Sequence, residues 1–155
     1  MIQRVQTLYL FGTIVACIAM LFFPFAGYSN PDRGLYLLTA NGIQYVNEHV
    51  TVNFWLTFPI LMINSLTIVL SALSIFMFKK RRIQLWFVNI SFLLTVILIM
   101  LLFFYYTGYV EKLANAVTSY RLGIAFPLVS LVSLVMASRA IRKDEALVKS
   151  VDRLR

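Results

Sequence analysis

The sequence is poor in the residues from which disulfides, metal sites and catalytic centres are built. Its 155 residues include one cysteine, Cys17, and one histidine, His49. A single cysteine cannot form an intramolecular disulfide, and a single histidine cannot build a histidine metal cluster. The sequence also has no glycine-rich phosphate loop, no zinc-ligand spacing and no Ser–His–Asp set at a nucleophile elbow. We therefore predict no metal, no cofactor and no catalytic residue.

Charged residues are absent from the middle of every long apolar stretch. The 6 acidic and 14 basic residues lie in loops, in the C-terminal segment or at the ends of these stretches. Ionisable groups inside a bilayer are costly and mark proton, ion or substrate pathways. Their absence argues against a proton-coupled carrier and against an intramembrane aspartyl or metallo-hydrolase. We predict that the protein is not an enzyme.

Long apolar stretches are the main feature that is present, and 61% of the residues are hydrophobic. The stretches cover residues 8–25, 54–78, 85–106 and 120–137. A helix that rises 1.5 Å per residue needs roughly 17–25 apolar residues to cross a bilayer. The sequence therefore predicts an all-α membrane protein, with residues 1–155 forming a single antiparallel bundle of transmembrane helices. The second and third spans are predicted to be neighbours, because the turn between them is short.

Positive charge is concentrated at one end of this predicted bundle. Lysine and arginine stay on the cytoplasmic side in short loops, so both termini and the middle loop are predicted to be cytoplasmic. The formal charge of +8 is then explained by topology and by attraction to anionic lipids rather than by nucleic acid. The cytoplasmic set is Arg4, Lys79, Lys80, Arg81, Arg82, Arg139, Arg142, Lys143, Lys149, Arg153 and Arg155, and the outer set is Arg33, Lys112 and Arg121.

The outer loop, residues 26–53, is predicted to hold a small β-hairpin. Asn41-Gly42 is a favoured two-residue hairpin turn, because both residues tolerate positive φ. This turn would place Ala40 opposite Ile43. An isolated hairpin is marginal in water, so we expect it to rest on the helix ends, the membrane surface or a partner.

Residues 138–155 continue the helical pattern beyond the fourth span but become amphipathic. Ala140 and Leu147 begin an apolar stripe along this tail, which also carries basic residues. Such a cytoplasmic helix lies in the headgroup region of a membrane or offers its stripe to a soluble partner. The residues that we expect to bind a partner are Arg142, Leu147, Val151, Arg153, Leu154 and Arg155.

Mild polarity inside the second span provides a different hypothesis. Asn64, Thr67, Ser71 and Ser74 recur three or four residues apart and so share one helix face. This face suits either a polar pathway for a small solute or helix packing, in which hydroxyl and amide groups bond across helices. Packing is the more common role of such residues.

The two ends of the chain resemble a known family. The chain opens with Met1-Ile2-Gln3-Arg4-Val5-Gln6-Thr7-Leu8-Tyr9-Leu10 and closes with Asp144-Glu145-Ala146-Leu147-Val148-Lys149-Ser150-Val151-Asp152-Arg153-Leu154-Arg155. With four spans between these ends, it resembles a family of small four-helix membrane proteins from Bacteroidetes-type bacteria that is classed as a domain of unknown function. The resemblance implies a bacterial inner membrane and a single uncleaved domain. It implies no activity, cofactor or catalytic residue.

The leading functional hypothesis is a non-catalytic accessory, scaffold or assembly subunit of an inner-membrane complex. We expect it to bind membrane lipids and another membrane or cytoplasmic protein, through the basic tail and the outer hairpin, but not nucleic acid. The alternative is a small carrier or channel, lined by the polar face of the second span and assembled as a homo-oligomer.

Overall fold

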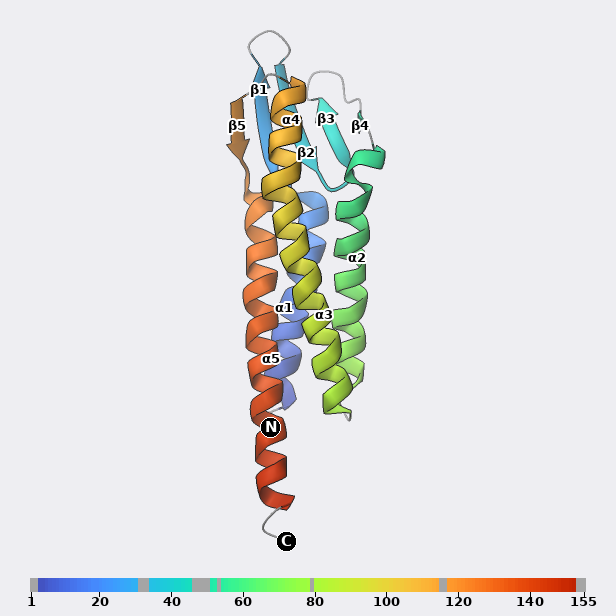
Figure 1. Ribbon diagram of the computed structural model, residues 1–155, viewed down its shortest axis with the longest axis vertical. Helices are drawn as coiled ribbons and strands as arrows, with labels where there is room; N and C mark the ends of the chain where they lie inside the picture. The colour runs from blue at the N-terminus through green and yellow to red at the C-terminus, as the bar shows by residue number, and fades with distance from the viewer. Residues whose placement is uncertain are drawn as a thin grey trace.

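Four long helices stand below a small antiparallel sheet in the computed structural model of the protein (Figure 1). The structure describes residues 3–30, 34–45, 51–52, 54–78, 80–114 and 117–152. Each long helix is long and apolar enough to cross a membrane, which confirms the predicted apolar helices and indicates a membrane protein. The candidate spans are Val5–Phe22, Trp55–Phe76, Arg81–Lys112 and Leu122–Val148.

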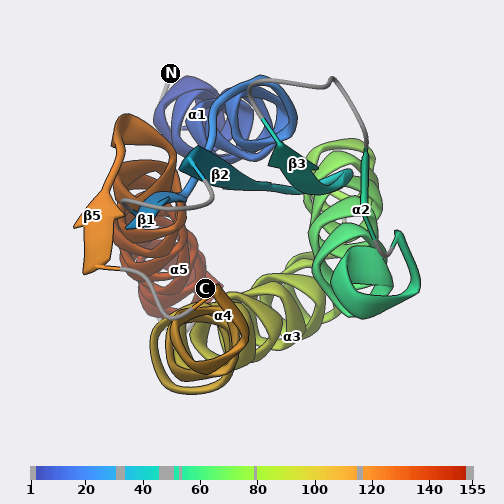
Figure 2. The ribbon, with the colours of Figure 1, turned by 90° about the horizontal axis from the view of Figure 1, so that it is seen from above.

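The long helices form a ring in which each contacts two neighbours, in the order α1, α2, α3, α5 (Figure 2). α2 and α3 are joined by a short turn and lie side by side, as the sequence predicts. α1 begins and α5 ends at the end of the ring that lies opposite the sheet (Figure 1). The bounds are α1 Gln3–Phe22, α2 Phe54–Phe76, α3 Arg81–Met100 and α5 Ala125–Asp152.

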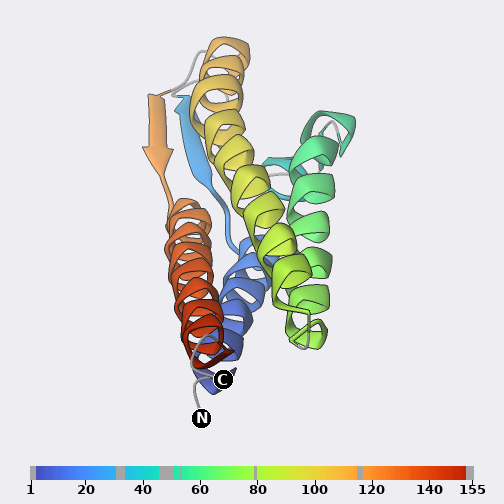
Figure 3. The same ribbon diagram turned by 60° about the horizontal axis from the view of Figure 1, so that its bottom comes forward.

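The third helix extends further than the sequence predicts. It continues from α3 through a π-helical segment, Leu101–Tyr106, into α4 (Thr107–Ala114). Figure 3 shows α3 and α4 as one rod that reaches up beside the sheet. The helix therefore does not end at residue 106, where the sequence predicts the end of the third span. A glycine costs a helix only about 1 kcal/mol, and Tyr106 and Val110 bury their side chains beneath the sheet.

The part of the chain outside the ring forms a five-stranded antiparallel sheet rather than the single hairpin that the sequence predicts. Its strand order is β4-β3-β2-β1-β5, so the two connecting loops contribute to the same sheet. The loop between α4 and α5 supplies β5, whereas the sequence assigned Tyr120 to the start of the fourth span. The strands are β1 Ala26–Asn30, β2 Gly34–Thr39, β3 Gly42–Tyr45, β4 Thr51–Val52 and β5 Val117–Tyr120.

The predicted hairpin is present between β2 and β3, but its register is different. Thr39 pairs with Gly42, whereas the sequence predicts Ala40 opposite Ile43. The turn residues are therefore Ala40 and Asn41. Gly42 has a φ of 144°, which residues with a side chain rarely adopt. The Thr39 hydroxyl donates a hydrogen bond of 2.7 Å to the Gly42 carbonyl oxygen, which closes the turn in this register.

An apolar cluster lies at each end of the ring. We call the sheet, α4 and the upper cluster the cap, and the end of the ring around the lower cluster the base. Large side chains from the sheet and the helix ends fill the cap cluster, whereas the base cluster is small. The cap cluster contains Met20, Phe25, Ala26, Tyr28, Leu38, Ala40, Ile43, Ile60, Leu98, Leu102, Tyr106 and Val110, and the base cluster contains Leu10, Val88, Leu134, Ala137 and Ile141.

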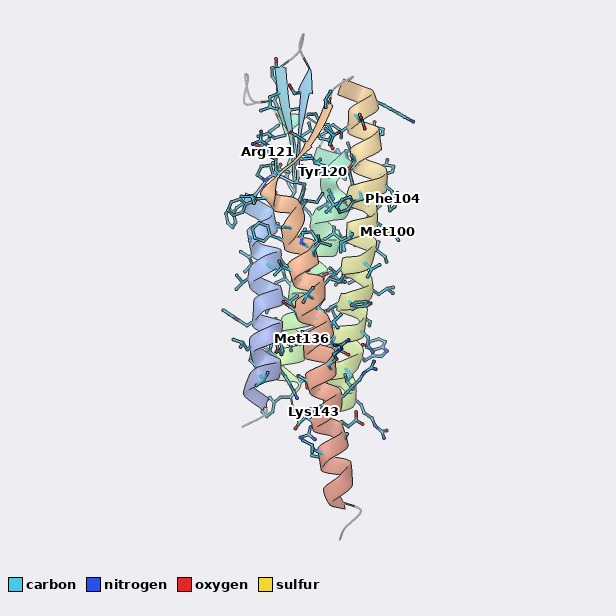
Figure 4. The ribbon with its side chains drawn as sticks, turned by 90° about the vertical axis from the view of Figure 1, so that its left-hand side faces the viewer. Met100, Phe104, Tyr120, Arg121, Met136 and Lys143 are labelled. Carbon is cyan, nitrogen blue, oxygen red and sulfur yellow. The ribbon has the colours of Figure 1, made fainter. Side chains whose placement is uncertain are left out.

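Backbone contacts around Pro24 tie the cap to α1 and α5. The Arg121 amide donates to the Phe25 carbonyl oxygen and the Gly123 amide to the Pro24 carbonyl oxygen, both at 3.0 Å. A Cβ on Gly123 would overlap the Pro24 carbonyl oxygen, so this close approach requires glycine. Figure 4 shows Tyr120 and Arg121 at this junction, where β5 leads through a 3-10 turn, Leu122–Ile124, into α5.

Candidate functional site

Buried polar side chains line the inside of the helix ring, from below the cap cluster down to the base. The predicted polar face of α2 is fully buried, with each of its side chains at most 1% exposed. The other helices add buried polar residues that the sequence analysis did not select as site residues. We call this set the polar column: Asn64, Thr67, Ser71 and Ser74 of α2, Gln6 and Thr13 of α1, Gln84, Ser91 and Thr95 of α3, and Ser130 of α5.

The outer surface of the ring is apolar. Large hydrophobic side chains such as Phe11, Met62 and Leu93 are exposed there. Figure 4 labels Met100 and Met136 on this surface, on α3 and α5. A ring that is apolar outside and polar inside suits a lipid environment, in which the hydrophobic effect supplies no drive for helix association.

Most polar groups of the column bond to backbone carbonyls. The Asn64 amide nitrogen donates to the Cys17 carbonyl oxygen at 2.9 Å and so joins α2 to α1. The hydroxyls of Thr67 and Thr95 donate to carbonyls four residues earlier in their own helices, at 2.9 and 2.8 Å. The column is therefore partly a packing device, which is the more common of the two predicted roles.

Several buried oxygen atoms of the column have no hydrogen-bond partner within the described ranges. They are Asn64 Oδ1, Ser71 Oγ, Gln84 Oε1 and Ser91 Oγ, and all belong to α2 and α3. A buried polar atom without a partner costs roughly 1–3 kcal/mol, and such atoms commonly bond to buried water. The α2–α3 side of the column thus carries acceptor atoms that buried water could satisfy.

An ion pair joins α3 to α5 at the base. Arg81 Nη2 lies 3.0 Å from Asp144 Oδ2, and the two side chains are 24% and 11% exposed. Arg81 Nη1 also donates to the Asp144 carbonyl oxygen at 3.2 Å. The sequence placed Asp144 in the tail, but α5 passes the predicted boundary at residue 138 without a break, and Ile141 is buried in the base cluster. The sequence could not reveal this pair, because its partners lie far apart in the chain.

A groove opens between α3 and α5 near the base, with a volume of about 240 Å³. Its apolar part is formed by Phe92, Leu134 and Val135, and its polar part by Asn89, Ser138, Arg139 and Arg142. Within the described part of the chain, we find no hydrogen bond or ion pair to the Arg139 or Arg142 guanidinium. Arg142, predicted to bind a partner protein, thus belongs to this groove.

The last turns of α5 extend past the base (Figure 1). Leu147 and Val148 are 44% and 42% exposed there. Val151 also lies in α5, but its side chain is not among those that the structure describes. The remaining residues predicted to bind a partner, Arg153, Leu154 and Arg155, lie outside the described residues.

The described residues contain no group of three or more His, Cys, Asp or Glu side chains that could hold a metal ion. His49 lies outside these residues. Cys17 is buried beside the polar column, and its carbonyl oxygen accepts the Asn64 bond. The candidate sites are therefore the polar column, the groove between α3 and α5, and the exposed end of α5.

Comparison with known proteins yields a match over nearly the whole chain. A family model described as a domain of unknown function (DUF4293) matches residues 2–154. No curated protein matches the chain. The family match covers the ring and the cap together, and its description assigns no activity to either.

Proposed function

Because the chain belongs to the family of the domain of unknown function DUF4293, whose description assigns no activity, we propose a function from the geometry of the chain itself. The protein is a non-catalytic scaffold or accessory subunit. It sits in a bacterial inner membrane, with its base and both termini in the cytoplasm. The exposed end of α5 binds another protein there. The bacterial membrane rests on the resemblance of the chain ends, and the orientation rests on the positive charge at the base.

The projection of α5 past the base carries this proposal. Its 28 residues extend about 42 Å, whereas the hydrocarbon core of a bilayer is about 30 Å thick. The end of the helix therefore stands clear of the apolar core. Leu147 and Val148 are exposed on this part, and apolar side chains gain free energy when a partner removes them from water.

The charge at the base supports a cytoplasmic partner. Lys80 and Arg82 in and after the α2–α3 turn lie at the same end as Arg142 and Lys143 of α5. Basic residues in short loops are retained on the cytoplasmic side of a membrane. The projecting end of α5 would then meet cytoplasmic proteins or the cytoplasmic parts of membrane proteins.

The test substitutes the exposed apolar pair, Leu147→Asp with Val148→Asp, and leaves Ile141 and Asp144 in the ring. A matched control, Lys143→Asp with Ala146→Asp, adds acidic groups to the same turns and keeps the apolar pair. Each chain is purified in mild detergent, and bound proteins are quantified. We expect the first variant to recover a bound partner protein in an amount about tenfold or more below that of the wild type, and the control to recover as much as the wild type. Equal recovery with all three chains would contradict the proposal.

A second candidate function, a small oligomeric carrier or channel, is favoured by the unpartnered oxygen atoms of the polar column. Solute or water flux into proteoliposomes is measured for the wild type and for Asn64→Leu with Ser71→Val. Ser65→Leu, on the exposed side of α2, is the control. Flux that the column variant abolishes and the control retains would place this candidate above the scaffold. Flux no greater than that of protein-free liposomes would reject it.

A further inference from the structure

The groove between α3 and α5 is amphipathic along the axis of the ring. On α5, Leu134, Ser138 and Arg142 are four residues apart and share one helix face. Leu134 lies nearer the middle of the ring, and Arg142 lies about 12 Å further toward the base, at 1.5 Å per residue. The groove is therefore apolar toward the middle of a bilayer and cationic toward its surface.

The cationic end of the groove has no ion-pair partner within the described residues. Arg81, on the neighbouring helix, is paired with Asp144, whereas Arg139 and Arg142 have no such partner there. Guanidinium groups present several N–H donors in a planar fork that matches phosphate oxygens. Ser138 adds a hydroxyl above these guanidiniums, and Asn89 adds an amide from α3 across the groove. This donor set is complementary to a phosphate ester.

The depth of the groove matches the headgroup region. About 20 residues of helix cross the hydrocarbon core, so α5, which begins at Ala125, leaves it near residue 144. Arg139 and Arg142 lie within the last turns before that point, and long arginine side chains extend toward the headgroups. The volume of about 240 Å³ is below the roughly 300–1,000 Å³ of pockets that enclose a whole small molecule, and suits part of a lipid.

A second groove, between α1 and α2, provides a comparison within the same molecule. It has a similar volume, about 290 Å³, and is lined by Leu21, Phe58, Leu61 and Met62 with Asn64 and Ser65. None of the described residues that line it is charged. Such a groove would accept acyl chains without regard to the headgroup, so selectivity for charge belongs to the groove between α3 and α5.

We propose that the groove between α3 and α5 is a binding site for an anionic phospholipid of the leaflet at the base. The lipid phosphate accepts hydrogen bonds from Arg139 and Arg142, and the upper part of an acyl chain lies along Phe92 and Val135. Basic pockets between transmembrane helices on the cytoplasmic side bind anionic headgroups by the same principle. The site is independent of the protein partner at the end of α5.

The test removes the two charges of the groove with Arg139→Gln and Arg142→Gln. The control, Lys80→Gln with Arg82→Gln, removes two exposed charges at the same end but outside the groove. Binding of phosphatidylglycerol and of phosphatidylcholine to the purified chain is measured by native mass spectrometry. We expect affinity for phosphatidylglycerol to fall about tenfold to thirtyfold in the groove variant and less than about twofold in the control. Affinity for phosphatidylcholine should not change.

A second measurement locates the acyl chain. Phe92→Trp is introduced after Trp55→Phe and Trp86→Phe, so that the introduced indole is the single tryptophan. Brominated phosphatidylglycerol should quench its fluorescence, and Arg139→Gln with Arg142→Gln should weaken the quenching.

An equal loss of phosphatidylglycerol affinity in both charge variants would overturn the proposal, because it would show that binding depends on the total positive charge at the base and not on the groove. Equal affinity for the two lipids would also overturn it. Displacement of phosphatidylglycerol by inorganic phosphate, together with no quenching, would identify a site for a free anion instead.

Discussion

The cap and the middle of the helix ring are built on opposite principles. The cap buries large apolar and aromatic side chains, among them Phe25, Tyr28 and Tyr106. The middle of the ring buries hydroxyls and amides, among them Asn64 and Ser71, and exposes its large apolar side chains. The proposed topology accounts for the difference. Water around the sheet would drive apolar burial, whereas lipid around the helices would provide no such drive, so close packing and polar contacts would hold the helices.

The comparison also identifies the junction on which both regions depend. The Pro24 carbonyl oxygen accepts a hydrogen bond from the Gly123 amide at the point where α1 and α5 meet the sheet. The tests below change one region at a time. If the two regions are stabilised differently, substitutions of equal burial should have unequal effects.

The largest effect is expected in the cap. Phe25→Ala should lower the free energy of unfolding by about 3–5 kcal/mol, because it removes a buried aromatic ring and leaves a cavity. Phe25 is 1% exposed and Phe22 is 77% exposed, so Phe22→Ala is the matched control. Both are measured by unfolding in mixed micelles. Equal destabilisation by the two variants would show that apolar burial does not hold the cap.

The next largest effect is expected at the junction. Gly123→Ala should destabilise the protein by about 1–3 kcal/mol, because the new methyl group would displace the Pro24 carbonyl. Gly108→Ala should instead stabilise it by up to about 1 kcal/mol, because a Cβ at this position in α4 meets no atom within 4 Å. Thermal unfolding in detergent distinguishes the two. A shift in the same direction for both variants would contradict the close approach at Gly123.

A smaller effect is expected in the polar column. Asn64→Leu removes the 2.9 Å bond to the Cys17 carbonyl oxygen but also the unpartnered Oδ1. The net loss should be about 1 kcal/mol, in line with interhelical hydrogen bonds in other membrane proteins. Ser65→Leu, at an exposed position of the same helix, should have no destabilising effect. If Asn64→Leu lowered the free energy of unfolding as much as Phe25→Ala does, the ring and the cap would not differ in how they are stabilised.

The effect that is smallest at neutral pH depends on the ionisation of Tyr28 in the cap. Burial raises the pKa of the Tyr28 hydroxyl from 10 to about 12. The folded cap should therefore keep its stability below about pH 10 and lose some of it between about pH 10 and 12, where the unfolded phenol ionises first. Tyr28→Phe should unfold like the wild type at pH 8 and become relatively more stable as the pH rises. Parallel stability curves over this range would contradict the burial of the hydroxyl.

Features carried by local sequence could be predicted, and features that join distant segments could not. The face formed by Asn64 and Ser71 follows from helical spacing alone, and the structure buries it as one stripe. The strand β5 pairs with β1, which lies about 90 residues earlier in the chain. Nothing in the four residues of β5 indicates that β1 is its pairing partner. The pair between Arg81 and Asp144 was missed for the same reason.

The sequence by itself determined that the chain forms four long apolar helices, because length and hydrophobicity are properties of each segment alone. Only the tertiary structure decided that the two connecting loops share one sheet and that polar faces of several helices meet in one column. It also decided that Arg139 and Arg142 line a groove with Phe92, while Arg81 is neutralised by Asp144. These contacts depend on which helices become neighbours, and the free energy that selects neighbours arises only when the segments pack together.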